Sequence, residues 1–141
     1  MAVITRPTRF ESATCEGYKY KETMELARFC IAPSYHKKNF ASWFLSRATN
    51  EIFKDESVKA IMSFADLTLG HNGSIYLACN WKLVHTVPPD YWYVNGDNHF
   101  MHKRTLYGYA VKMSLKEADF AMKFGYDKVM GKGKLKFIKL R

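Results

Sequence analysis

The sequence predicts a single α/β domain, and three observations lead to that prediction. Short apolar segments with the period of a β-strand alternate along the chain with a longer segment that has the period of a helix. Hydrophobic residues make up 48% and charged residues 25% of the chain, a composition that supports a packed core and excludes wholesale disorder. A chain of 141 residues is most simply one domain, residues 1–141, that buries about two-thirds of its unfolded surface.

The first half of the chain is expected to supply a strand, a basic loop and a helix. Residues 1–20 show little periodicity and predict an irregular arm or a short strand. Residues 24–32 alternate with the two-residue period of a strand, and Pro33 ends the pattern. Apolar side chains then recur every four residues, at Phe40, Phe44, Ala48 and Ile52. This spacing predicts a helix, with Asn39 as its N-cap.

The middle of the chain predicts a buried strand, a turn and an aromatic hairpin. Residues 58–65 are short and apolar with a β-branched start, which is typical of a strand buried on both faces. Gly70 and Gly73 mark the turn that follows, and residues 74–81 are too short for periodicity to separate helix from strand. Residues 91–94 predict an aromatic strand that leads into an Asn-Gly hairpin signal at residues 95–96.

The last third of the chain predicts one short helix and one strand. Ser114 and Glu117 have the spacing of a capping box, and Gly125 has the position of a helix stop. The apolar residues between Leu135 and Leu140 predict a closing strand. The order of strands and helices therefore favours an α/β domain, in which ligands bind at the carboxyl ends of strands.

The charge of the chain points to a polyanionic partner. The chain has 22 lysines and arginines against 13 aspartates and glutamates, a formal charge of +9. A field of this sign attracts phosphates, and nucleic acid is the commonest polyanion that such a domain meets. A soluble protein that is merely basic is the competing interpretation.

Cysteine and histidine spacing argues against disulfides and metals. The three cysteines, Cys15, Cys30 and Cys79, are odd in number and form no C-x-x-C pair, and the five histidines are scattered. No signal-like N-terminus is recognisable, and no apolar segment approaches the roughly 18 residues that span a bilayer. We therefore expect no metal, no membrane and a reducing cytoplasm.

The basic loop before the predicted helix is a candidate phosphate site. Lys37 and Lys38 lie next to Asn39 at the expected helix N-terminus, where free backbone N–H groups and the helix dipole favour an anion. The loop contains no glycine, so it matches neither a P-loop nor a dinucleotide-binding fingerprint. A solvated loop is the alternative.

Five side chains in the two predicted strands, the helix and the turn are candidates for chemistry. Arg28 lies among apolar neighbours, so its guanidinium requires a partner if it is buried. Asp66, at the end of the next strand, is the obvious partner. The pair could be a structural salt bridge, or it could also shape a catalytic pocket. His71 could shuttle protons from the turn, or be simply exposed. Tyr76 could present a phenol as general acid or donor, or belong to the core. Ser42 lies near the start of the predicted helix with no base in sequence contact, and its alternative is a solvated or capping hydroxyl.

The segment YWYVNGDNHFMHKR combines aromatic rings with positive charge. Stacking faces and phosphate partners together are the means by which proteins hold unpaired or flipped bases. The nucleic-acid candidates in it are Tyr91, Trp92, Tyr93, Lys103 and Arg104. A hairpin that belongs to the core is the alternative.

Two stretches, ELARFCIAPSYHKKNFASWFLSRA and SFADLTLGHNGSIYLACNW, resemble the Mom family of phage DNA-modification proteins. The resemblance covers roughly Met24 to Trp81, with a weaker similarity in the closing GKGKLKFIKL. Its motifs are an arginine within a strand, a helix start N-x-x-S-W-F-L, a strand that ends in S-F-A-D, and G-H-x-G-x-I-Y. The Mom family in turn resembles the GNAT acyltransferases. This implies an α/β (α+β) fold with a GNAT-like mixed central sheet flanked by short helices.

The resemblance implies a function and a set of residues. Mom-like proteins convert the N6 amine of adenine in DNA to a carbamoylmethyl derivative, which protects phage DNA from host restriction. Their functional residues correspond to Arg28, Ser42, Asp66 and Tyr76. The resemblance also implies an acetyl-CoA or related CoA donor, although simple acetyl transfer would not produce this group.

The partners expected from the resemblance are double-stranded DNA with a flipped adenine and, optionally, a second copy of the chain in a homodimer, in the cytoplasm of the infected bacterial host. Two alternatives stay open. One is a GNAT-type N-acyltransferase that acts on a protein or a small-molecule amine. The other is a non-catalytic module on the same fold that binds nucleic acid or a host-defence protein.

Overall fold

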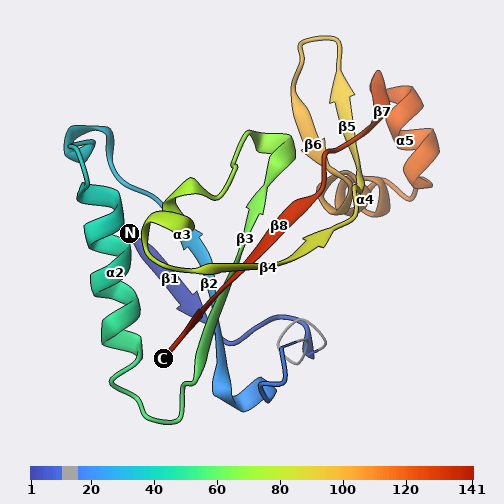
Figure 1. Ribbon diagram of the computed structural model, residues 1–141. Coiled ribbons are helices and arrows are strands. Elements are labelled where there is room, and N and C mark those ends of the chain that lie inside the picture. The colour runs from blue at the N-terminus through green and yellow to red at the C-terminus, as the bar shows by residue number, and fades with distance from the viewer. Residues whose placement is uncertain (11–15) are drawn as a thin grey trace. The chain divides into compact units, whose positions relative to one another are not determined.

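The protein is described by a computed structural model that covers residues 1–10 and 16–141. It consists of two compact units (Figure 1). Unit 1 comprises Met1–Val87 and Lys134–Arg141, and unit 2 comprises Pro88–Gly133. Part of the predicted N-terminal arm, residues 11–15, and with it Cys15, lies outside the described residues.

Unit 1 is built on a five-stranded mixed sheet with the strand order β1-β2-β3-β8-β4. Its strands are β1 (Ala2–Thr5), β2 (Thr23–Phe29), β3 (Ala60–Asp66), β4 (Lys82–Val87) and β8 (Lys134–Leu140). Strands β2 and β3 are parallel, and the other three pairs in the sheet are antiparallel. The predicted mixed α/β fold class is therefore confirmed, as are the strands predicted around Arg28, before Asp66 and at the C-terminus.

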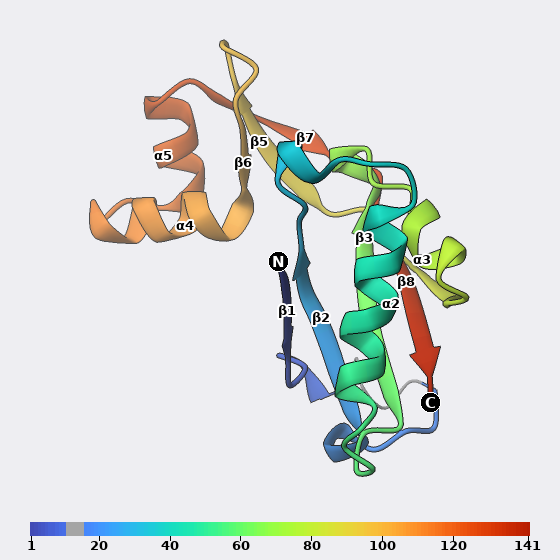
Figure 2. The same cartoon turned by 90° about the vertical axis from the view of Figure 1, so that its left-hand side faces the viewer.

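Helix α2 (Phe40–Ile52) runs along one face of this sheet, and the short α3 (Ser74–Ala78) lies on the same face (Figures 1 and 2). Leu45, which is fully buried on α2, belongs to the same core as Leu26 and Ile61 of the sheet. The segment 74–81, for which periodicity left two choices, is thus a helix at its start. Three 3-10 turns complete the unit, namely η1 (Tyr20–Glu22), η2 (Pro33–Tyr35) and η3 (Leu67–Leu69).

The predicted cap of α2 needs a correction. Asn39 does occupy the N-cap position, but its backbone is left-handed (φ 62) and its side chain makes no capping hydrogen bond. Instead, the Ser42 hydroxyl donates a hydrogen bond of 3.0 Å to the Asn39 carbonyl. An N-cap side chain reaches the first free N–H groups from an extended backbone, and the left-handed turn removes that reach.

The parallel pair β2 and β3 forms a fork. The two strands pair from Thr23 with Ala60 to Glu25 with Met62, and the ladder then stops although both strands continue for four more residues. Each strand stays paired on its outer side, with β1 and with β8 respectively. The carboxyl halves of two parallel strands therefore diverge in the middle of the sheet, which leaves room between them.

Unit 2 is a three-stranded antiparallel sheet with two helices. Its strands have the order β6-β5-β7, with β5 (Tyr91–Asn95), β6 (Phe100–His102) and β7 (Tyr126–Met130), and its helices are α4 (Lys103–Lys112) and α5 (Glu117–Lys123). The predicted hairpin at residues 95–96 and the helix stop at Gly125 (φ 66) are confirmed. Helix α4 and strand β7 were not predicted.

The predicted capping box of α5 is wrong. Ser114 lies outside the helix in a left-handed conformation (φ 55), and Lys116 is the N-cap. The Glu117 carboxylate accepts hydrogen bonds from the hydroxyls of Tyr91 and Tyr93 instead. The side chain that would have closed the box thus ties the helix to the sheet of unit 2.

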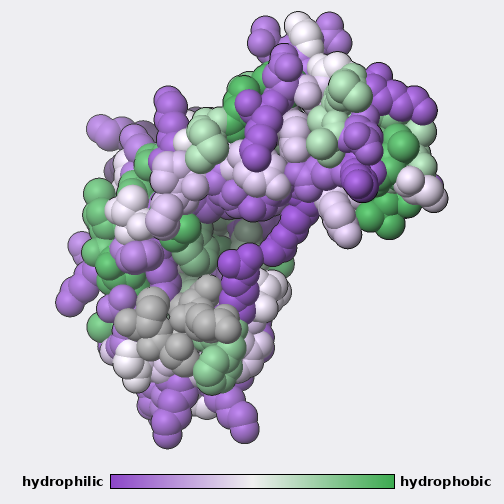
Figure 3. Space-filling view, turned by 90° about the vertical axis from the view of Figure 1, so that its right-hand side faces the viewer, coloured by the Kyte–Doolittle hydropathy of each residue, from purple (hydrophilic) through white to green (hydrophobic). Residues whose placement is uncertain are grey.

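Exposed apolar side chains are frequent in unit 2. They include Tyr107, Tyr109, Met122 and Phe124 of the two helices and their ends. In the space-filling view, apolar side chains lie next to strongly polar ones on this unit (Figure 3).

Candidate active site

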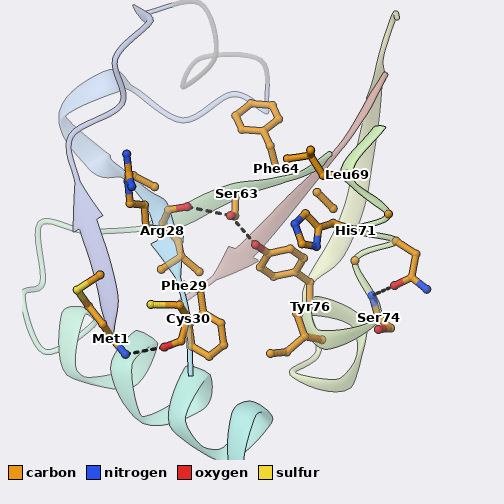
Figure 4. A pocket seen from close by; sticks show the side chains of 17 residues that line it. Met1, Arg28, Phe29, Cys30, Ser63, Phe64, Leu69, His71, Ser74 and Tyr76 are labelled. Carbon is orange, nitrogen blue, oxygen red and sulfur yellow. Dashed lines mark hydrogen bonds between the residues drawn. The ribbon is translucent and has the colours of Figure 1, made fainter. Parts of the chain in front are cut away.

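The fork between β2 and β3 opens into a cavity of about 780 Å³. Residues 26–30 form one wall, residues 63–65 the floor, and residues 69–76 of the turn and α3 the other wall. This volume lies within the range of about 300–1,000 Å³ that is typical of small-molecule sites. Three predicted site residues, Arg28, His71 and Tyr76, line it together (Figure 4).

Ser63 bridges the fork at the point where the strand ladder ends. Its hydroxyl donates a hydrogen bond of 2.9 Å to the Leu26 carbonyl of β2. The oxygen of the same hydroxyl lies 2.8 Å from the hydroxyl of Tyr76 (Figure 4). Ser63 is 2% exposed, so both bonds are shielded from water. Ser63 was not among the predicted site residues, although it is the first residue of the S-F-A-D motif.

Tyr76 is anchored at the inner end of the cavity by its ring as well as by its hydroxyl. The ring packs against Phe137 at 4.9 Å and against Trp81 at 5.2 Å between centroids. Burial raises the pKa of the Tyr76 phenol above its usual value of 10.0. Tyr76 is therefore both a core residue and a neutral phenol that faces the cavity.

The proposed pairing of Arg28 with Asp66 is wrong. The Asp66 carboxylate lies 3.2 Å from the ammonium of Lys134 on the neighbouring strand β8 and accepts a second hydrogen bond from the Thr68 backbone N–H. Arg28 is exposed on the cavity wall, and the divergence of β2 and β3 separates it from Asp66. An exposed guanidinium needs no buried partner, so the premise of the pairing does not hold.

Asp66 acts on the turn rather than on the cavity, since it is not among the described residues that line the cavity. Its side chain caps η3 through Thr68, and its carbonyl accepts a hydrogen bond of 3.1 Å from the His71 backbone N–H. His71 itself is exposed and lines the cavity between Gly70 (φ 77) and Gly73 (φ 76). Asp66 therefore stabilises the turn that places His71 at the cavity.

The four predicted residues around the start of α2 lie away from the described cavity lining. Lys37, Lys38 and Asn39 are exposed in the loop between η2 and α2. The Ser42 hydroxyl donates to the Asn39 carbonyl and does not cap a free backbone N–H group of the helix. The carbonyl of Ser42 accepts a hydrogen bond of 3.3 Å from the Cys79 thiol, which links α2 to α3.

The predicted nucleic-acid candidates of unit 2 are largely engaged within the unit. Tyr93 is 5% exposed and donates a hydrogen bond of 2.7 Å to Glu117, and burial followed by that bond raises its pKa to about 12. The Tyr91 ring has the ammonium groups of Lys128 and Lys103 at 3.9 and 4.7 Å from its centroid. A base therefore cannot reach the buried Tyr93 ring, and lysines cover that of Tyr91.

Trp92 and the two basic candidates have different surroundings. The Trp92 and His102 rings form a T-shaped pair with their centroids 5.1 Å apart. Lys103 pairs with Asp90 at 2.5 Å, and this bond is the first cause that lowers the pKa of that carboxyl. Arg104 is exposed at the start of α4.

A second aromatic group in unit 2, here called the α4–α5 row, was not predicted. Tyr109 of α4 stacks on the buried Phe120 of α5 (6.4 Å, 15°), and Phe120 packs on Phe124 (4.5 Å). The outer rings are 47% and 43% exposed, and each has a lysine ammonium nearby, that of Lys112 at 5.9 Å and that of Lys123 at 5.7 Å. The four-residue spacing of Leu106 and Ala110, both buried on α4, was the signal for this helix.

The described part of the chain offers neither a cluster of metal ligands nor a membrane helix. Residues 1–10 and 16–141 contain no group of three or more His, Cys, Asp or Glu side chains that could hold a metal ion. No helix among them is long and apolar enough to cross a membrane.

Comparison with known families gives a match that covers most of the chain. The family model of the Mom protein family matches residues 4–136, which includes all of the cavity-lining segments of β2, β3 and α3 as well as unit 2. A search of curated proteins gave no match.

Proposed function

Because the chain belongs to the Mom protein family, we propose that it is a phage enzyme that modifies adenine in DNA. The product carries a carbamoylmethyl group on N6, protects phage DNA from host restriction and forms in the cytoplasm of the infected bacterium. The observation that carries this proposal is the cavity in the fork, where the buried phenol of Tyr76 and the imidazole of His71 lie near each other and Arg28 contributes to the wall. Such convergence of polar groups in a cavity is typical of an active site.

The reaction is a substitution at a methylene carbon of the donor. A bond forms between adenine N6 and that carbon, the bond from the carbon to its leaving group breaks, and N6 loses one proton. Acetyl transfer would give an amide instead, so the transferred group is –CH2–CO–NH2. In this proposal the exposed imidazole of His71 takes the proton, since imidazoles exchange protons near neutral pH.

The fork also fits a coenzyme A type of donor. A mixed sheet whose two parallel strands diverge supports the resemblance to GNAT acyltransferases. Backbone groups of Leu26–Phe29 and Ser63–Asp66 face the fork outside the β2–β3 ladder, and the amide-bearing arm of coenzyme A would pair with such groups. Lys37 and Lys38, which are exposed before α2, would hold its phosphates.

The substrate base must leave the duplex to enter this cavity, because the N6 amine of a paired adenine is engaged in pairing. A protein that holds an unstacked strand needs stacking faces and positive charge. The α4–α5 row provides both, with rings that are already ordered by the buried Phe120. We assign DNA contact in unit 2 to this row, together with the exposed Arg104.

Mass analysis of nucleosides tests the proposed function. DNA from bacteria that express the wild-type chain should contain carbamoylmethyl-adenine, and DNA from bacteria that express Tyr76→Phe should contain at least about tenfold less, since the cavity then lacks the phenol. The variant keeps the ring packing against Trp81 and Phe137, so its melting temperature checks that it folds. Unmodified DNA from the wild-type strain would refute the proposal.

The two alternatives predict other results. An N-acyltransferase that acts on a protein or a small-molecule amine would leave DNA unmodified but would be stabilised by coenzyme A, by about 2.7 kcal/mol at a hundredfold excess over Kd. A binding module would show neither effect, and the absence of glycine from the loop around Lys37 and Lys38 favours it over the acyltransferase. A double Lys37→Ala, Lys38→Ala variant should lose the stabilisation, and Lys54→Ala, in an exposed pair with Glu51, serves as its control.

A further inference from the structure

We propose that Ser63 is a positioning residue that makes the Tyr76 hydroxyl a hydrogen-bond acceptor for the amine that enters the cavity. This inference rests on the proposed function, because it names the group of the substrate that Tyr76 recognises. It concerns one hydroxyl at the floor of the fork and two hydrogen bonds that it makes.

The direction of both bonds follows from counting hydrogens. The Leu26 carbonyl has no hydrogen to give, so the single hydroxyl hydrogen of Ser63 must lie in the 2.9 Å bond to that carbonyl. The Ser63 oxygen can then only accept in its 2.8 Å contact with Tyr76. Tyr76 is therefore the donor in that contact, and its own single hydrogen points away from the cavity.

Burial maintains this arrangement. Ser63 is 2% exposed and Tyr76 is 9% exposed, so water does not compete freely for either hydroxyl. Reversing the two bonds would leave the buried Leu26 carbonyl without its donor, and an unsatisfied buried acceptor is costly. In the resting protein, the lone pairs of the Tyr76 oxygen are thus what faces the cavity.

An acceptor at this place selects a donor. The N6 amine of adenine carries two hydrogens and only one is lost in the reaction, so the other can bond to the Tyr76 oxygen before and after the transfer. A carbonyl or carboxylate oxygen at the same place would be repelled, because its lone pairs would face those of the Tyr76 oxygen. The predicted role of Tyr76 as a proton donor would require its bond to Ser63 to break first.

The chain of hydroxyls orients the amine but does not remove its proton. It ends on the Leu26 carbonyl, an amide oxygen that does not take up a proton near neutral pH, so a proton that entered at Tyr76 would have no exit. The proton released from N6 therefore goes to His71, which lines the same cavity and is open to solvent. Orientation and proton removal are thereby assigned to different side chains.

Ser63→Ala tests the proposal, with Ser63→Thr as the conservative variant and Thr49→Val as the matched control. Thr49 is 1% exposed, and its hydroxyl donates to the Leu45 carbonyl at 3.0 Å, so it is another buried hydroxyl on a backbone carbonyl, within α2. Two quantities are measured for each variant. These are the modified-adenine content of DNA from expressing bacteria, and the pKa of Tyr76 followed by NMR of Cζ-labelled tyrosine with Tyr76→Phe for assignment.

The expected result is a specific pattern. Ser63→Ala should lower modification by about tenfold to a hundredfold, as expected when a reacting group is misplaced, and should change the pKa of Tyr76, because its buried hydroxyl loses its hydrogen-bond partner. Ser63→Thr should restore modification to at least about half, and Thr49→Val should change neither quantity. If Ser63→Ala modifies DNA as the wild type does, or loses activity with an unchanged Tyr76 pKa, the proposal is overturned.

The outcome is separable from that of the proposed function. Should the wild-type chain leave DNA unmodified, the proposed reaction fails, and the role of Ser63 is decided by the Tyr76 pKa together with binding of 9-methyladenine as a probe. The probe should shift the Tyr76 signal in the wild type and Thr49→Val but not in Ser63→Ala. Equal shifts in all three proteins would overturn the positioning role.

Discussion

Gly73 lies directly against the ring of Phe137, so closely that a Cβ atom at this position would be 2.2 Å from Phe137 Cε2. The same ring packs on Tyr76 at 4.9 Å. The glycine thus permits the contact that holds the catalytic tyrosine of the proposed function in place. Gly70, in the same turn, has an equally positive φ, but a Cβ atom there would have nothing within 4 Å.

Gly73→Ala and Gly70→Ala should therefore differ in stability and in activity. Both substitutions place a side chain at positive φ, which costs about 1–2 kcal/mol, and only Gly73→Ala adds overpacking of about 1–3 kcal/mol. Urea unfolding measures the difference. Modification of DNA should fall in Gly73→Ala beyond what its folded fraction explains, because Phe137 must move. Equal losses of stability in the two variants would contradict the close contact.

Asp66→Asn and Asp66→Ala separate a positioning role from a charge-dependent one. The Asn side chain can still accept the hydrogen bond from the Thr68 N–H, whereas Ala cannot. Loss of the ion pair with the 41% exposed Lys134 should cost at most about 1 kcal/mol. We expect Asp66→Asn to keep most of the modification activity and Asp66→Ala to lose about tenfold, since the turn that carries His71 loosens.

The control for this pair is Lys134→Met, which removes only the partner charge. It should behave like Asp66→Asn in nucleoside mass analysis. If Asp66→Asn were as inactive as Asp66→Ala while Lys134→Met stayed active, the carboxylate itself would be required for the reaction.

Tyr93 makes the stability of the protein sensitive to alkaline pH. Burial, followed by its bond to Glu117, raises the pKa of Tyr93 from 10.0 to about 12 in the folded state. A raised pKa means that the unfolded chain loses the proton first, so this stabilisation is complete below pH 10.0 and is lost as the pH rises through about 12. The free energy of unfolding, measured in urea across this range, should fall less steeply in Tyr93→Phe.

Tyr107→Phe is the control, because this tyrosine of α4 is 57% exposed. Its pH dependence should match that of the wild type. Parallel curves for wild type and Tyr93→Phe would show that the Tyr93 hydroxyl does not carry the effect.

Tyr109→Ala should weaken DNA binding if the α4–α5 row stacks on bases. Loss of one stacking platform costs about 1–3 kcal/mol, and Lys112→Ala should in addition reduce the salt dependence of binding by about one phosphate contact. Fluorescence anisotropy with a labelled duplex that contains an unpaired adenine measures both effects. Met122→Ala is the matched control, since this side chain is 80% exposed but belongs to no stack among the described residues. Equal losses for Tyr109→Ala and Met122→Ala would indicate a general apolar contact instead.

Local patterns predicted those elements whose packing repeats along the sequence. The apolar side chains of α2 recur every four residues, and the buried residues of β3 form one short run. Each pattern arises from the burial of a single element, so it can be recognised in the sequence of that element alone. Helix α4 was missed because its exposed aromatic residues, such as Tyr107 and Tyr109, mask the short spacing of its buried positions. Propensity and period together carry little information in so short a helix.

Partners across the sheet could not be read from the sequence. Asp66 meets Lys134 because β8, the last strand, lies beside β3, and this pairing depends on the whole strand order. Arg28 was assigned to Asp66 on the assumption that neighbouring parallel strands stay together, and the fork breaks that assumption. Ser63 went unnoticed for the same reason, since a serine in a buried strand has meaning only once the ladder beside it is known to end.

Capping residues failed through backbone conformation. Asn39 and Ser114 both have residue types and spacings that favour helix starts, yet both adopt positive φ. The Asn39 side chain makes no capping hydrogen bond, and Ser114 lies outside α5, whose N-cap is Lys116. Residue type predicted where the helices begin more closely than it predicted how they are capped.

The pairing of Val87 with Lys134 has a consequence for how this protein can be taken apart. These residues are register partners at the end of the antiparallel strands β4 and β8, and all of Pro88–Gly133 leaves and re-enters the sheet between them. In topological terms unit 2 is an enlarged hairpin loop. A two-residue Asn-Gly connection in its place would preserve the register of β4 and β8. The shortened chain would retain the fork and its cavity but lack the α4–α5 row. Donor chemistry and DNA capture could then be measured separately, by comparing the shortened chain with the full-length protein.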